Sequence, residues 1–152
     1  MINIEVPECY AGKVEVTLLE RAAAVTLGGQ SAPFDSELTI VVTDDEQLHQ
    51  LNKQFLGIDA PTDVLAFPAS YIDSDSGLLY LGDILISFPR SQIQAEATGH
   101  PVMDELQLLV VHGVLHLLGH DHAEASEKAR MWTAQGEILD KLGLPTVNPP
   151  AE

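Results

Sequence analysis

The sequence has 152 residues, a length that predicts one domain over residues 1–152. Seven lysines and arginines stand against 23 aspartates and glutamates, and a net charge of −16 repels free nucleic acid, whose nonspecific affinity comes largely from cations that neutralise phosphates. Cys9 is the only cysteine, which excludes an internal disulfide and makes a reducing cytoplasm the expected compartment. The N-terminus does not resemble a signal peptide, and the longest apolar stretch, residues 106–119, is shorter than the roughly 20 residues that cross a bilayer, so no membrane association is expected.

The spacing of apolar residues predicts nine elements in chain order. They are a strand over 2–6, a helix over 12–27, a strand over 38–42, a helix over 44–55, strands over 64–67 and 79–87, and helices over 89–97, 103–118 and 123–142. Pro68 is expected to end the third strand, and Gly82 to mark a bulge or a close backbone approach in the fourth. Residues 69–77 predict a mobile acidic loop and residues 147–152 a frayed tail.

This order of elements predicts an α+β fold with a small mixed sheet of about four strands packed with helices. The third and fourth strands follow each other directly, which favours an antiparallel pair within the mixed sheet. The helix over 103–118 is apolar nearly all round. It is therefore expected to pack at the centre, with helices or sheet on both sides.

Three histidines near the end of this helix carry the strongest functional signal. His112 and His116 are four residues apart, so they lie on one helical face. Gly119 can end the helix, because glycine adopts the left-handed conformation without steric penalty, and the chain can then bring His122 back to the same point. Three neutral imidazole nitrogens with an open fourth position describe a catalytic zinc site. The spacing predicts one Zn²⁺ on His112, His116 and His122.

His120 and Asp121 lie in the same turn and are alternatives to His122 as third ligand. They rank lower because the i, i+4, i+10 spacing with an intervening glycine is that of the metzincin proteases. Zinc proteases of this kind place a glutamate directly after the first histidine as general base. Gly113 occupies that position here and has no side chain to take a proton. The pattern therefore argues against ordinary zincin proteolysis.

Residues 112–122 match throughout the H-G-x-L-H-L-x-G-x-D-H signature of the YbeY family of bacterial metal-dependent endoribonucleases, which the chain resembles over residues 37–135. Upstream blocks at residues 51–68 and 81–84 support the resemblance. It implies a zincin-like fold, one zinc on the three histidines and cleavage of single-stranded RNA. It also implies roles in maturation of the small-subunit ribosomal RNA 3′ end and in ribosome quality control, where recruitment by basic ribosomal proteins would offset the acidic surface.

One position departs from the family's pattern. Members commonly carry an arginine just before the glycine of the upstream block, which is expected to face the active site and contact phosphate, whereas this chain has Leu56 before Gly57. Loss of that cation would weaken the stabilisation of transition-state charge. Lys53 is the first substitute to consider, and a solvated helix lysine is its alternative interpretation.

The implied chemistry is metal-assisted phosphodiester hydrolysis, because zinc lowers the pKa of a bound water to about 7. Asp121 is expected either to orient His122 or to cap a turn. His120 is expected to shuttle a proton, with an exposed loop residue as the alternative. Asp63 and Asp83 are further candidates near the pocket, with turn residues as the alternative.

Two other functions stay open at this point. A different zinc hydrolase could act on a small amide or ester, because three histidines and water do not dictate a substrate. A noncatalytic ribosome-associated factor could use zinc only to fasten the helix to the following loop. Leu56 favours the second alternative, and the open coordination position opposes it.

Overall fold

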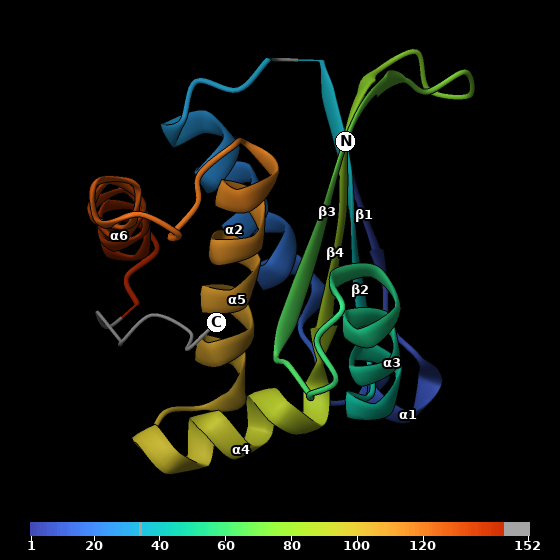
Figure 1. Ribbon diagram of the computed structural model, residues 1–152, viewed down its shortest axis with the longest axis vertical. Helices are drawn as coiled ribbons and strands as arrows, with labels where there is room; N and C mark the ends of the chain where they lie inside the picture. The colour runs from blue at the N-terminus through green and yellow to red at the C-terminus, as the bar shows by residue number, and fades with distance from the viewer. Residues whose placement is uncertain (34, 145–152) are drawn as a thin grey trace.

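A four-stranded mixed sheet organises the computed structural model, which describes residues 1–33 and 35–144 (Figure 1). The strands are β1 (Ile2–Glu5), β2 (Ser36–Thr43), β3 (Val64–Ile72) and β4 (Leu79–Ser87), in the order β1-β2-β4-β3. β1 and β2 pair in parallel, as do β2 and β4, whereas β3 and β4 pair antiparallel. The predicted antiparallel pair within a mixed sheet is therefore confirmed.

Within residues 1–33 and 35–144, six helices pack around this sheet. They are α1 (Glu8–Ala11), α2 (Val16–Gly29), α3 (Asp45–Leu56), α4 (Phe88–Thr98), α5 (Val102–Leu117) and α6 (Ala125–Lys141). Figure 1 shows α2 and α5 on one side of the sheet with α6 outside them, α3 on the other side, and α4 across one end. The predicted α+β class is confirmed. None of the helices in the described residues is long and apolar enough to cross a membrane.

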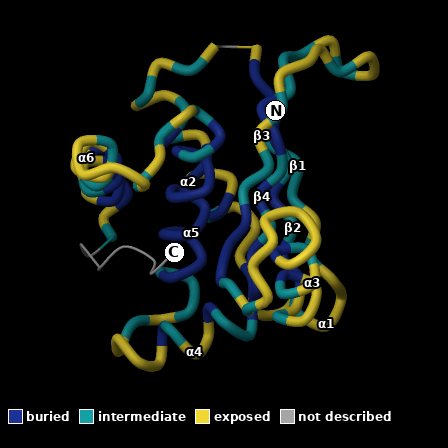
Figure 2. The backbone as a smooth tube through the Cα atoms, in the orientation of Figure 1, coloured by how far each residue is buried: buried dark blue, intermediate teal, exposed yellow. Residues whose placement is uncertain are grey.

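The central position predicted for the helix over 103–118, which is α5 in the structure, is confirmed. Twelve of the 16 residues of α5 are buried, and the helix contacts α2, α4, α6, β3 and β4 (Figure 2). Its buried leucines and valines join Leu38, Ile40 and Ile84 of the sheet in one hydrophobic core. A helix that is apolar on every side needs such cover on every side. The buried part of α5 therefore holds the partly exposed residues at the ends of the helix in place.

Two boundaries differ from prediction. The helix predicted from residue 12 begins at Val16, and α1, a single turn, precedes it. The strand predicted to stop at Pro68 continues to Ile72, with a register shift between Pro68 and Tyr71. Since β3 is an edge strand, a proline there interrupts the pairing only locally. The predicted acidic loop is correspondingly shorter, and the predicted tail at residues 147–152 lies outside the described residues.

Gly82 fulfils the prediction of a close backbone approach. Its φ is +136°, and a Cβ there would overlap the carbonyl oxygen of Phe67 and lie 2.8 Å from Cδ2 of Leu117. The register between β2 and β4 also shifts beside it. Only glycine fits a position that combines this φ with such a close neighbour. The contact brings the last turn of α5 against the β3–β4 hairpin.

Candidate metal centre

Three imidazoles converge where α5 ends. His112 and His116 point their Nε2 atoms at each other across one helical turn, 3.2 Å apart. The helix ends at Leu117 with Leu118 as its C-cap. Gly119 has a φ of +97°, and the amide N–H of His120 donates to the carbonyl of Leu115 at 3.0 Å. This turn returns His122 to the helix, so that one ring nitrogen from each of the three histidines lies within 4.8 Å of the others.

The distance between two of these nitrogens is compatible with a zinc ion. Zn–N bonds of 2.0–2.1 Å in a tetrahedral site place two nitrogens about 3.3 Å apart, close to the 3.2 Å between His112 and His116. Gln135 of α6 fixes the tautomer of the buried His112. Its Oε1 accepts a hydrogen bond from Nδ1 at 3.0 Å, which leaves the Nε2 lone pair of His112 facing the other histidines. Neutral imidazoles with this orientation are the form that binds zinc.

Trp132 of α6 supports the cluster from behind. Its ring stacks on those of His112 and His122, with centroid distances of 5.9 and 5.8 Å. His116 and His122 are partly exposed and line a cleft, whereas His112 is fully buried. The cluster is thus closed on the α6 side and open on the cleft side.

The other two polar residues of the turn take different positions. His120 Nε2 hydrogen-bonds Oε1 of Gln30 in the loop after α2, at 2.7 Å, and burial together with the charge of Arg130 lowers the pKa of His120. The carboxylate of Asp121 accepts a hydrogen bond from the backbone N–H of His122 at 2.7 Å. Asp121 therefore stabilises the turn that carries His122, and it also lines the cleft.

Gly113 faces the sheet. A Cβ at this position would lie 2.7 Å from Cγ2 of Ile84 on β4. Zinc proteases carry the general base at this sequence position. Here the space that such a side chain would need is occupied by the core residue Ile84.

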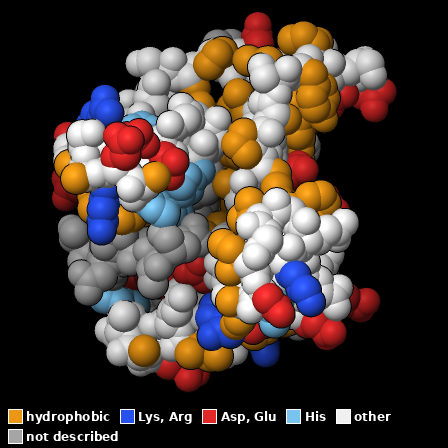
Figure 3. Space-filling model, in the orientation of Figure 1, with side chains coloured by type: hydrophobic (Ala, Val, Ile, Leu, Met, Phe, Trp, Pro, Cys, Tyr) orange, Lys and Arg blue, Asp and Glu red, His pale blue; other side chains and the backbone are white. Residues whose placement is uncertain are grey.

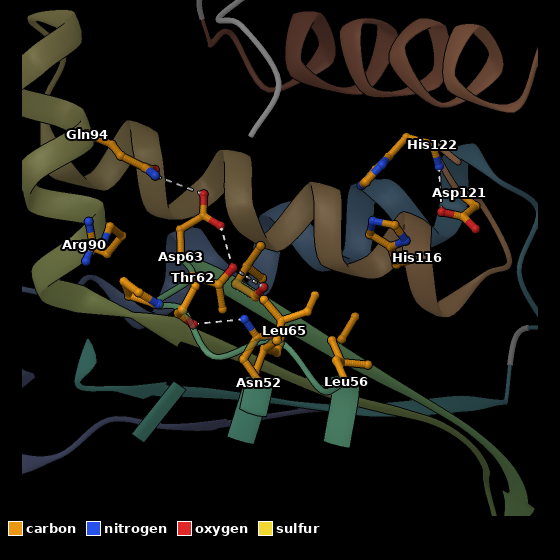
Figure 4. A pocket seen from close by; sticks show the side chains of 15 residues that line it. Asn52, Leu56, Thr62, Asp63, Leu65, Arg90, Gln94, His116, Asp121 and His122 are labelled. Atoms are coloured by element: carbon orange, nitrogen blue, oxygen red, sulfur yellow. Dashed lines mark hydrogen bonds between the residues drawn. The ribbon is translucent and has the colours of Figure 1, made fainter. Parts of the chain in front are cut away.

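A cleft of about 670 Å³ extends from the histidines along α5 to α4 (Figure 4). Histidine side chains lie on one wall and hydrophobic side chains on the opposite wall (Figure 3). The lining comprises Asn52, Leu56, Ile58, Ala60, Pro61, Thr62, Asp63, Val64, Leu65, Ala66, Arg90, Gln94, His116, Asp121 and His122. It is large enough for a small organic ligand or a segment of a larger one.

Carboxyl and amide groups occupy the far end of the cleft. Asp63 is buried directly before β3, and its Oδ2 accepts a hydrogen bond from Nε2 of Gln94 at 3.1 Å. Glu105, in the first turn of α5, does not line the cleft but is buried close to Asp63, and burial followed by the charge of Asp63 raises the pKa of Glu105 to about 7. Of the two aspartates proposed from sequence, Asp63 thus lines the cleft. Asp83 instead hydrogen-bonds Tyr80 in the sheet and is absent from the lining.

The cleft lining contains Arg90 of α4 but not Lys53 of α3. Lys53 is exposed, its Nζ is 3.7 Å from the carboxylate of Asp59, and it does not line the cleft. Its alternative interpretation, a solvated helix lysine, describes this position. Leu56 does line the cleft, while Arg90 of α4 supplies a positive charge at the far end. Arg90, Gln94, Glu105 and Gln135 were all missed, because no local spacing links them to the histidines.

This chain is similar to several known proteins in sequence and in fold. The model of a family described as Endoribonuclease YbeY matches residues 10–143. A protein named Endoribonuclease YbeY from Chloroflexus aurantiacus is 47% identical over 134 residues, which cover 84% of this chain and 87% of that protein. One of the same name from Roseiflexus castenholzii is 43% identical, covering 95% and 94%. The solution structure of TM1509 from Thermotoga maritima superposes with a TM-score of 0.62 at 27% identity, covering 93% of this chain and 89% of that one.

Proposed function

This chain belongs to the endoribonuclease YbeY family, and we propose on that basis that it is a zinc-dependent endoribonuclease acting on single-stranded RNA. Its biological role in this proposal is maturation of ribosomal RNA, at the 3′ end of the small-subunit RNA, and ribosome quality control. The observation that carries the proposal is the convergence of three histidine ring nitrogens on a point that opens into the cleft.

His112, His116 and His122 would hold one zinc ion. Zinc in such a site acts as a Lewis acid toward a phosphoryl oxygen and lowers the pKa of water. Gln135 keeps Nδ1 of His112 protonated, and Asp121 keeps the His122 turn in place. Hydrogen bonds of this kind orient metal ligands and raise metal affinity.

Two residues are proposed to move protons or orient groups beside the histidines. Asp121 borders both the cleft and a neighbouring cavity of about 360 Å³. His120 lines that second cavity and not the cleft, so it would exchange protons with the substrate only through Asp121 or water. Gly113 contributes no base, which separates this site from the zinc proteases.

With a net charge of −16, the protein is expected to need a partner protein in order to bind RNA. A chain with seven lysines and arginines gains little from nonspecific attraction to phosphates. We therefore propose that ribosomal proteins with basic surfaces recruit it in the cytoplasm. The hydrophobic wall of the cleft, which includes Leu56, Ile58 and Leu65, offers contact to unpaired bases, whose faces are not available in a duplex.

A cleavage assay tests this function. The zinc-loaded protein is expected to cleave a labelled single-stranded RNA and to leave the matching duplex intact. Cleavage should stop after EDTA treatment and should resume when zinc is added. Casein and unstructured peptides should remain uncut. RNA turnover that persists after complete metal removal would contradict the proposal. Zinc-dependent turnover of a small ester or amide without RNA cleavage would instead support a different zinc hydrolase.

A further inference from the structure

The end of the cleft opposite the histidines carries a single fixed positive charge. Among the described residues that line the cleft, Arg90 is the only lysine or arginine. It lies in the first turn of α4, one helical turn before Gln94, and Figure 4 shows both side chains at the end away from His116 and His122.

The Arg90 side chain is held in a fixed orientation. Its Nε and Nη2 donate to the two carboxylate oxygens of Asp45, at 3.2 and 2.8 Å, and the hydroxyl of Ser87 donates to the same carboxylate at 3.2 Å. This ion pair uses two of the five N–H donors of the guanidinium. The side chain retains 31% of its exposure, so the other donors have access to solvent and to a ligand.

Arg90 lies on α4, and the distance between its end of the cleft and the histidine end can be estimated along α5, which runs between the two ends. Glu105 lies near Asp63 at the Arg90 end, and His112 is seven residues further along the helix. At 1.5 Å per residue the two ends are about 10 Å apart. One phosphate group cannot contact both, whereas an RNA strand lying along the cleft brings a second phosphate to the far end.

We infer that Arg90 binds a backbone phosphate of the RNA next to the one that is cleaved. The inference rests on the proposed ribonuclease function. Arginine suits this role because its planar fork pairs with phosphate through two parallel hydrogen bonds. Asp63 and Asp45 are nearby negative charges, so the contact is expected to be modest, about tenfold in affinity.

Salt dependence of RNA binding tests the contact directly. Binding of a single-stranded oligoribonucleotide is measured in EDTA, which keeps the RNA intact, at several salt concentrations. Arg90→Gln is expected to weaken binding about tenfold and to reduce the slope of log K against log salt by about 0.7, the value for one phosphate contact in a single strand. Arg90→Lys should restore the slope, since it restores the charge.

Two matched variants separate this contact from a purely structural ion pair. Asp45→Asn breaks the ion pair but keeps the cation, so the slope should remain that of wild type. Lys53→Gln removes an exposed cation outside the cleft and should also leave the slope in place. An unchanged slope in a folded Arg90→Gln variant, or an equal loss of slope in Asp45→Asn, would overturn the inference.

A second measurement compares substrates with one phosphate and with several. For zinc-loaded Arg90→Gln, the loss in kcat/KM should be about tenfold greater with the oligonucleotide than with bis(p-nitrophenyl) phosphate, which has a single phosphate. Equal losses on both substrates would place Arg90 at the cleaved phosphate and overturn the inference. If the wild-type protein neither binds nor cleaves RNA, the proposed function fails as well, and the two failures are thereby distinguished.

Discussion

The two ends of the cleft hold their polar groups in opposite ways. At the histidine end, one ring nitrogen from each of His112, His116 and His122 lies within 4.8 Å of the others. At the far end, Asp63 and Arg90 are already engaged by Gln94 and Asp45. Groups with converging lone pairs are suited to bind a metal ion, whereas compensated charges are suited to hold a shape. Metal binding and positioning are therefore assigned to different ends of one cleft.

The largest effect is expected from removal of a histidine ligand. His112→Ala, His116→Ala and His122→Ala should each lose zinc and reduce RNA cleavage below detection, because two ligands rarely retain zinc. Elemental analysis and the cleavage assay measure both quantities. His120→Ala is the control and should keep its metal, since its ring bonds Gln30. Full zinc occupancy in His122→Ala would show that His122 is not the third zinc ligand.

At the far end, the buried Glu105 makes stability depend on pH. Its pKa is raised from 4.5 to about 7, so the protonated form stabilises the fold fully below about pH 4.5, and that stability is lost as pH rises through 7. Glu105→Gln mimics the protonated acid and should raise the free energy of unfolding at pH 8 by about 2–3 kcal/mol.

Denaturant unfolding at pH 5 and pH 8 measures this gain for Glu105→Gln. The gain over wild type should be clearly smaller at pH 5. Glu96→Gln, at an exposed position on α4, is the matched control and should show no such difference. A Glu105→Gln variant that is less stable than wild type at pH 8 would mean that the far end requires the charge.

The hydrogen bond from His112 to Gln135 sharpens the comparison at the histidine end. Gln135→Ala should weaken zinc binding about 10- to 100-fold, because the orientation and tautomer of His112 are no longer fixed. Gln135→Glu keeps an acceptor and should retain tight binding. Competition with a chromophoric chelator gives the affinities, with exposed Gln92→Ala as control. Equal affinities for wild type and Gln135→Ala would remove Gln135 from the site.

The smallest effect is expected from a substitution in the hydrophobic wall of the cleft. Leu56 lines the cleft and is 56% exposed, so an arginine there has room to face a phosphate. Leu56→Arg should raise RNA cleavage by up to about tenfold without changing zinc content. Gln54→Arg adds the same charge outside the cleft lining and is the control. An unchanged rate in zinc-loaded Leu56→Arg would show that no phosphate passes this wall.

The features that could be predicted from the sequence alone depend on residues that are close together in the chain. The i, i+4 spacing of His112 and His116 fixes their shared face, and Gly119 ends the helix whatever the rest of the chain does. The core helix and the mixed sheet were predictable for the same reason, because periodicity and element order are local properties. The close approach at Gly82 was also predictable from a glycine within a strand.

What the sequence did not predict depends on contacts between distant segments. Gln135 is 23 residues from His112, and Arg90 is 45 residues from Asp45. No periodicity relates such pairs, so only the packing of α6 on α5 and of α3 beside α4 reveals them. The continuation of β3 past Pro68 is similar, since it depends on β3 being an edge strand. The four-residue α1 is too short to show a helical pattern.

The contact between Gly113 and Ile84 limits how this site can be redesigned. One substitution, Gly113→Glu, would give the sequence the H-E-x-x-H pattern of zinc proteases. Its Cβ would already lie 2.7 Å from Ile84, so the rest of the glutamate would enter the core beside the sheet instead of reaching the three histidines. A peptidase built on this scaffold needs a smaller residue in β4 and a rotated helix as well. The fold thus separates this metal centre from proteolysis by several simultaneous changes.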